Sequence, residues 1–285
     1  MRSQAVPSRI VAACAAGALF AWAGAAATEN EFPDIPTPFL ASTPLAVDEM
    51  LRLAGVGPRD VVFDLGSGDG RVAIAAARDY GARGVGIEID GKLVEESREH
   101  ARRAGVADRV EFRHGDALEA DVGAATVVTM YLLAPLVEKL KPKLLAELKP
   151  GARIVAHDYG FRGWKPDRQA MISKNFYLYV VPAQAAGKWQ LRAALPGGER
   201  DYELEFDQHY QELRGGVRVP GGFLPAYEAR LSGERITFVL VDDGMSHRFE
   251  GRVRGKAMEG VVCSGPGRAP AVNAWRATRV ALDKS

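Results

Sequence analysis

Short apolar runs alternate with longer amphipathic stretches between residues 43 and about 158. The apolar runs predict strands at 61–65, 84–88, 109–113, 126–130 and 153–156. The stretches between and before them predict helices at 44–54, 71–80, 90–105 and 135–148. Strands that are apolar at nearly every position and alternate with helices are typical of a parallel sheet covered on both faces.

The pattern changes after about residue 176. Apolar and polar residues then alternate one by one, as at 202–207, 236–240 and 249–253. A period of two predicts antiparallel strands with one polar face, arranged as a sheet or a small barrel. We therefore expect a Rossmann-like α/β domain at 28–184, followed by a smaller antiparallel β domain at 185–285.

The first 27 residues follow neither pattern. Arg2 and Arg9 precede an apolar stretch, residues 10–27, that ends in alanines and turns polar at Thr28. These are the parts of a secretory signal peptide. An uncleaved membrane anchor is an alternative, because 18 apolar residues can just span a bilayer. A lipoprotein cleavage box at 11–14 is a second alternative to the signal peptide. We expect export, or a membrane-anchored domain outside the cytoplasm.

Charge and cysteine content narrow the functional classes. The chain has 37 basic and 36 acidic residues, and removal of Arg2 and Arg9 with residues 1–27 leaves 35 against 36. Such neutrality gives no general attraction to nucleic acid, so we expect no nucleic-acid partner. The two cysteines, Cys14 and Cys263, are too few for a disulfide framework or a cysteine-based zinc site, and we expect no metal.

The most informative segment follows the first predicted strand and reads Asp64-Leu65-Gly66-Ser67-Gly68-Asp69-Gly70. Glycines at a strand-to-helix junction let the backbone approach a ligand at the carboxyl edge of a sheet. The third glycine comes one residue earlier than a dinucleotide-binding fingerprint requires. Asp64 would also repel a pyrophosphate, whereas it would attract a ligand with a positive centre.

With these residues the chain resembles the class I methyltransferases that use S-adenosylmethionine, whose first motif is an acid followed by G-x-G-x-G. The resemblance implies that Asp64 lies near the ammonium of the cofactor, Glu88 holds the ribose hydroxyls and Asp116 lies near the adenine amino group. The cofactor-binding residues that it implies are Asp64, Gly66, Ser67, Gly68, Asp69, Gly70, Glu88, Ile89, Asp116 and Ala117.

Four segments bear on the methyl acceptor. Residues 127–133 lack the Asn/Asp-Pro-Pro-Tyr run of enzymes that methylate DNA adenine or glutamine. The string at 64–71, Ile35-Pro36-Thr37-Pro38 and Trp164-Lys165-Pro166-Asp167 resemble the protein-lysine methyltransferases of the ATP synthase c-subunit and the adenine nucleotide translocase. This resemblance implies methyl transfer to a lysine amino group of a protein substrate.

A lysine must be neutral to act as a nucleophile, so desolvation or a nearby acceptor must lower its pKa. Tyr131 and Asp158, which follow the fourth and fifth predicted strands, are the catalytic candidates: Tyr131 to hydrogen-bond the amine, and Asp158 to orient it or accept a proton. Thr129, His157 and Trp164 are further candidates for the substrate site. For His157 and Trp164 the alternative is packing inside the protein.

Two other functions stay open. The chain is also compatible with an exported binding or assembly protein on a methyltransferase scaffold, because S-adenosylmethionine is a cytoplasmic metabolite and the N-terminal segment predicts export. Methylation of a small molecule is the third possibility. Residues 185–285 carry no catalytic cluster, and the pattern specifies no oligomeric state.

Overall fold

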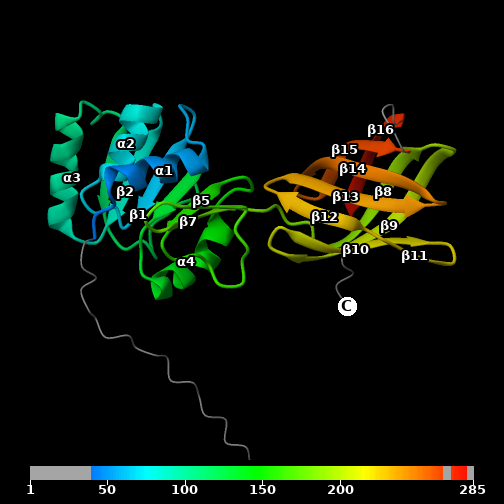
Figure 1. Ribbon diagram of the computed structural model, residues 1–285. Helices are drawn as coiled ribbons and strands as arrows, with labels where there is room; N and C mark the ends of the chain where they lie inside the picture. Colours follow the sequence, from blue (N-terminus) through cyan, green and yellow to red (C-terminus); the bar gives the residue numbers. More distant parts are fainter. Residues whose placement is uncertain (1–39, 266–270, 281–285) are drawn as a thin grey trace, which may run out of the picture. The chain divides into compact units, whose positions relative to one another are not determined.

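The computed structural model describes residues 40–265 and 271–280, which fold into two sheets (Figure 1). The predicted signal segment, residues 1–27, and the segment Ile35-Pro36-Thr37-Pro38 lie outside the described residues. Within the described ranges, no helix has both the length and the apolar character needed to cross a membrane.

The first sheet has the strand order β3-β2-β1-β4-β5-β7-β6. Its strands are β1 Val61–Leu65, β2 Arg83–Glu88, β3 Val110–His114, β4 Val127–Met130, β5 Arg153–His157, β6 Arg168–Met171 and β7 Asn175–Val180. Strands β1 to β5 run parallel, as predicted, whereas β7 is antiparallel to both β5 and β6. The β6–β7 hairpin, which the sequence pattern did not predict, makes the sheet mixed.

Among the described residues, four helices accompany this sheet: α1 Pro44–Ala54, α2 Arg71–Tyr80, α3 Gly91–Arg103 and α4 Ala134–Glu147. Thr43 begins α1 as predicted, because its side chain accepts a hydrogen bond from the Ala46 backbone. Val62 packs with α1 and α2, whereas the next residue, Phe63, packs with α4. Since successive side chains of a strand point to opposite faces, the helices cover both faces of the sheet.

The strand order reverses direction between β1 and β4. In sheets of this kind, ligands bind at the carboxyl ends of the strands near such a reversal. The segments that leave this edge are the glycine loop after β1 and the residues that follow β2, β3, β4 and β5.

The second sheet is antiparallel throughout and contains β8 Gly187–Leu195, β9 Gly198–His209, β10 Glu212–Val219, β11 Gly222–Pro225, β12 Tyr227–Ser232, β13 Arg235–Asp242, β14 Met245–Arg254, β15 Ala257–Ser264 and β16 Ala271–Arg279. Pairing of β9 with both β8 and β10 closes the sheet into a barrel, drawn from green to red in Figure 1.

Large apolar side chains, among them Trp189, Phe206, Phe238 and Phe249, fill the core of this barrel. A small closed barrel has an interior just wide enough for side chains, so this barrel is a packed unit. The two sheets share no strand, and β7 ends at Val180 before β8 begins at Gly187. The division of the chain at 184/185 stays a prediction.

Candidate functional site

The glycine loop after β1 has a backbone that only glycine adopts without strain. Gly66, Gly68 and Gly70 have φ angles of 74°, 54° and 81°, in the left-handed region. A Cβ on Gly70 would lie 2.6 Å from the Phe112 ring, and one on Gly66 would lie 2.7 Å from a methyl group of Leu132. Conformation and packing together therefore require the predicted glycines.

Asp69 and Ser67, two polar residues of the loop, differ in the hydrogen bonds that their side chains make. Both carboxylate oxygens of Asp69 accept hydrogen bonds from the Arg71 guanidinium, at 2.8 and 2.5 Å, and Arg71 also donates to the Ser42 carbonyl. Asp69 thus connects the loop, through Arg71, to the segment before α1. Ser67 is buried, and its hydroxyl has no hydrogen-bond partner among the described residues. An unpaired buried hydroxyl is costly, and a polar ligand in the loop would satisfy it.

Asp64 is buried under the loop and accepts a 2.7 Å hydrogen bond from the Thr129 hydroxyl. Burial raises the pKa of Asp64 to about 7, and the negative charges of Glu88 and Asp69 act in the same direction against the Thr129 hydrogen bond. A ligand cation beside Asp64 would favour its charged form. Thr129, one of the predicted substrate-site residues, is itself fully buried and holds Asp64 through this hydrogen bond.

Glu88 ends β2 and joins this loop to the next one. Its carboxylate accepts hydrogen bonds from the backbone N–H groups of Gly68 at 2.8 Å, Ile89 at 2.9 Å and Asp90 at 3.0 Å. A carboxylate has about four acceptor positions, so Glu88 keeps capacity for a hydroxyl donor.

The other predicted cofactor residues lie at the same sheet edge. Asp116 follows β3 and accepts from the Leu118 backbone with one oxygen, while Ala117 is buried beside it. Ile89 is 69% exposed although it is apolar. S-adenosylmethionine fits this set of groups. They are an acid for its ammonium (Asp64), an acid for its ribose diol (Glu88), a hydroxyl without a partner among the described residues (Ser67) and an exposed apolar side chain (Ile89).

The predicted acceptor residues Tyr131, His157 and Asp158 lie at or just after the carboxyl ends of β4 and β5. The rings of Tyr131 and His157 stack with centroids 4.0 Å apart, and Phe176 of β7 stacks on the other side of His157 at 4.6 Å. Burial lowers the pKa of His157 to about 4, and its Nδ1 lies 3.3 Å from the Ser42 hydroxyl. A buried, neutral and stacked imidazole is a structural histidine, so His157 supports Tyr131.

The two catalytic candidates converge on a lysine that the sequence pattern did not single out. Asp158 has a left-handed φ of 72°, and its Oδ2 accepts a 2.5 Å hydrogen bond from Lys174 Nζ. The same Nζ lies 5.3 Å from the centre of the Tyr131 ring, within range of a cation–π interaction. The aromatic, β-rich run 175–180 was the available signal for the hairpin that carries Lys174.

Trp164, the last of the predicted substrate-site residues, lies in the segment after β5. It is 2% exposed and packs against Phe161 and Tyr179, with ring centroids 5.4 and 4.9 Å apart. The Tyr179 hydroxyl accepts a hydrogen bond from the Phe161 backbone, which ties the segment after β5 to β7. Packing inside the protein, the alternative for Trp164, is what the structure shows.

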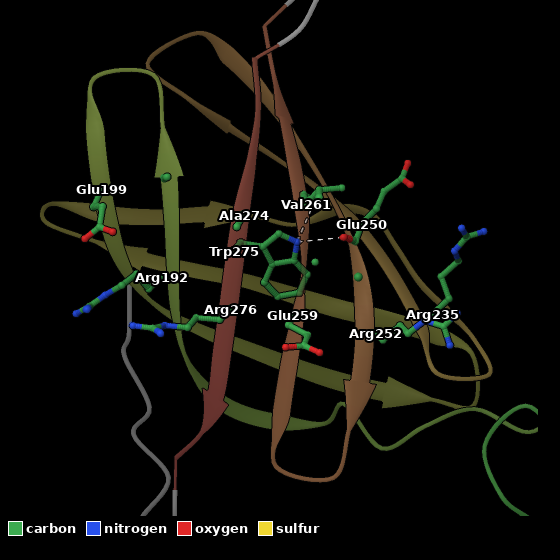
Figure 2. Close-up of a pocket in the computed structure, with 13 residues that line it drawn as sticks. Arg192, Glu199, Arg235, Glu250, Arg252, Glu259, Val261, Ala274, Trp275 and Arg276 are labelled. Atoms are coloured by element: carbon green, nitrogen blue, oxygen red, sulfur yellow. Dashed lines mark hydrogen bonds between the residues drawn. The ribbon is translucent and has the colours of Figure 1, made fainter.

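A groove of about 860 Å³ lies on the outer face of the barrel (Figure 2). Trp275 Nε1 donates from beneath it to the carbonyl oxygens of Glu250 and Val261, at 3.2 and 3.0 Å. The charged residues that line the groove are Arg192, Glu199, Arg235, Glu250, Arg252, Glu259 and Arg276. Across both sheets, the described residues contain no cluster of His, Cys, Asp or Glu suited to a metal ion.

Known proteins resemble the part of the chain that holds the glycine loop. Residues 64–168 match the ANTKMT methyltransferase domain. A protein-lysine N-methyltransferase of Saccharolobus islandicus is 41% identical over 155 residues, which cover 52% of this chain and 93% of that protein. The lysine N-methyltransferase of the ATP synthase c-subunit in Mus musculus is 35% identical over 130 residues, covering 46% of this chain and 52% of the mouse protein.

One solved structure shares both the fold and the sequence. An RNA methyltransferase of Salinibacter ruber in complex with S-adenosyl-L-homocysteine superposes with a TM-score of 0.51 and 50% identity, over 51% of this chain and 95% of that one. The similarity extends over nearly the whole length of both the Saccharolobus and the Salinibacter proteins. The chain therefore belongs to the ANTKMT family of S-adenosylmethionine-dependent methyltransferases.

Proposed function

We propose that this enzyme transfers the methyl group of S-adenosylmethionine to the side-chain amine of a protein lysine. The observation that carries the proposal is the pairing of Asp158 and Tyr131 around the ammonium of Lys174. A carboxylate and an aromatic face are the two groups that bind a lysine ammonium best. The names of the Saccharolobus and mouse relatives support the same acceptor.

The cofactor supplies a methyl group on a positively charged sulfur. The chain itself would act by placement and by proton transfer, since correct orientation alone supplies about 7–11 kcal/mol in such reactions. Asp64, Glu88 and the glycine loop hold and orient the bound group. Asp158 and the Tyr131 ring would bind and orient the incoming lysine in its charged form, and Asp158 would relay to water the proton that the ammonium must lose before its lone pair is free.

The test is to incubate the full chain with methyl-labelled cofactor, a protein extract and total RNA. We expect label in protein, on lysine Nζ when the peptides are sequenced by mass spectrometry. Asp158→Asn should lower kcat at least tenfold, whereas the control Asp79→Asn, an exposed acid on α2, should not change it.

The other outcomes identify the competing functions. Label in RNA alone would assign the activity named for the Salinibacter relative and refute the lysine proposal. Label in a small molecule would refute it equally. Cofactor binding without any transfer would favour a binding or assembly protein on this scaffold.

We also propose that residues 1–27 direct export, so that the enzyme works outside the cytoplasm or at its membrane. Support comes from the basic start, apolar middle and alanine-rich end of that segment. A C-terminal alkaline phosphatase fusion should be active and a β-galactosidase fusion inactive. The reverse result would refute export and remove its conflict with a cofactor made in the cytoplasm.

A further inference from the structure

The β6–β7 hairpin delivers one side chain to the acceptor site. Strand β7 pairs with β5 so that Phe176 lies opposite His157, and the Asp158 backbone N–H donates to the Asn175 carbonyl at 2.7 Å. This register sets the turn before β7, where Lys174 lies, beside the residue that follows β5. The position of Lys174 is therefore fixed by strand pairing.

The Lys174 ammonium has the two partners that the proposed function assigns to a substrate lysine. Nζ lies 2.5 Å from Asp158 Oδ2 and 5.3 Å from the centre of the Tyr131 ring. The hydrogen bond to the Asp158 carboxylate, with Tyr131 acting in the same direction, raises the pKa of Lys174 above its ordinary value. Lys174 is thus held in its charged form, in which its lone pair is unavailable to accept a methyl group.

Two ammonium groups cannot share this pair at contact distance without strong repulsion. On the basis of the proposed function, we infer that Lys174 is a built-in competitor of the substrate: it occupies the Asp158–Tyr131 site when no substrate lysine is bound and must leave before one enters. Its side chain is 41% exposed, so it has a route into solvent.

The side chains near Lys174 form a surface of the kind that contacts a protein substrate. Met171, Ile172 and Tyr159 are 74%, 43% and 41% exposed although they are apolar or aromatic. A substrate segment that covers them would draw Lys174 away from Asp158 while its own lysine enters. Partly exposed ion pairs are weak, so displacement of Lys174 costs only a small factor in affinity.

The test compares the full chain with Lys174→Met, which keeps the stem and removes the charge, and Lys174→Arg, which keeps the charge. Without cofactor, n-butylammonium serves as a lysine mimic and its binding is followed by NMR. We expect Lys174→Met to bind it about two- to fivefold more tightly than the unaltered chain, because one weak ion pair no longer competes. Lys174→Arg should bind it no more tightly than the unaltered chain does.

In the methylation assay, Lys174→Met should lower KM for the protein substrate by a similar factor, with KM for the cofactor unchanged. Lys149→Met, an exposed lysine at the opposite end of β5, is the matched control. Equal n-butylammonium affinity for Lys174→Met and the unaltered chain, with normal thermal unfolding of both, would refute the inference. Methylation of Lys174 itself, detected by mass spectrometry after incubation with cofactor, would refute it as well.

The methylation assay and the amine-binding comparison can fail independently of each other. If no protein lysine is ever methylated, the proposed function is wrong, but the binding comparison still reports whether Lys174 competes for the Asp158–Tyr131 site. If lysines are methylated and amine affinity does not depend on Lys174, only the competitor is wrong.

Discussion

At the scale of single residues, Asp64 links cofactor binding to pH. Its pKa of about 7 means that the carboxyl is largely protonated at pH 5 and must ionise to pair with the ammonium of the cofactor. Affinity for S-adenosylmethionine should therefore fall as the pH drops from 7 to 5, approaching tenfold per pH unit at the lower end. Calorimetry at pH 5, 6 and 7 in buffers of different ionisation enthalpy should also show proton release.

The same raised pKa affects the stability of the cofactor-free enzyme. A carboxyl whose folded pKa lies above its unfolded value stabilises the fold at low pH, and this contribution is lost as the pH rises through 7. Asp64→Asn should therefore raise the free energy of unfolding by about 2 kcal/mol at pH 8 and by much less at pH 5. It should also remove the pH dependence of cofactor affinity, and a variant that kept this dependence would contradict the assignment to Asp64.

Ser67 gives a second prediction at this scale. Its buried hydroxyl has no partner among the described residues, so Ser67→Ala removes an unpaired polar group. We expect thermal unfolding of the cofactor-free enzyme to be unchanged or shifted upward, while cofactor affinity falls about tenfold, because one hydrogen bond to the ligand is lost. A drop in cofactor-free stability with unchanged affinity would show that the hydroxyl serves the fold instead.

At the scale of elements, sequence periodicity predicted strands β1 to β5 and helices α1 to α4 closely, because apolar runs alternate there with amphipathic stretches, several of which are bounded by Thr43, Asp90 or glycines. Sequence periodicity missed the β6–β7 hairpin, and with it Lys174. Both strands are short, and they lie where the hydrophobic pattern changes from the α/β type to strict alternation, near residue 176. Periodicity also did not reveal that Thr129 hydrogen-bonds to Asp64, since every residue of β4 is buried and alternation then cannot tell which side chain meets the ligand edge.

The barrel strands carry a pair of like charges that can be tested directly. Arg235 on β13 lies opposite Arg252 on β14, at one side of the groove in Figure 2. Like charges directly opposite each other destabilise a sheet, and opposite charges contribute about 0.2–1 kcal/mol. Arg235→Glu should therefore raise the free energy of unfolding by up to about 1 kcal/mol, and Arg235→Gln by less. Urea unfolding should show a gain that shrinks in high salt, and a salt-independent gain would rule out this electrostatic cause.

At the scale of the whole molecule, the enzyme combines a cofactor-binding sheet and a closed barrel whose buried core draws on its own strands. All predicted cofactor residues lie in the first of these, between Asp64 and Ala117. A ligand that binds only one folded unit stabilises that unit, by about 2.7 kcal/mol at a hundredfold excess over its Kd. The response to ligand can therefore report whether the two sheets unfold together.

We expect scanning calorimetry of the full chain to resolve two transitions, because the two sheets share no strand. S-adenosylhomocysteine should raise only one of them, and Asp64→Asn should remove most of that rise. Arg235→Glu should move only the other transition. If only one transition is seen, and both S-adenosylhomocysteine and Arg235→Glu shift it, the two sheets form one cooperative unit. In that case the barrel would stabilise the cofactor site energetically, and barrel variants such as Arg235→Glu should also alter cofactor affinity.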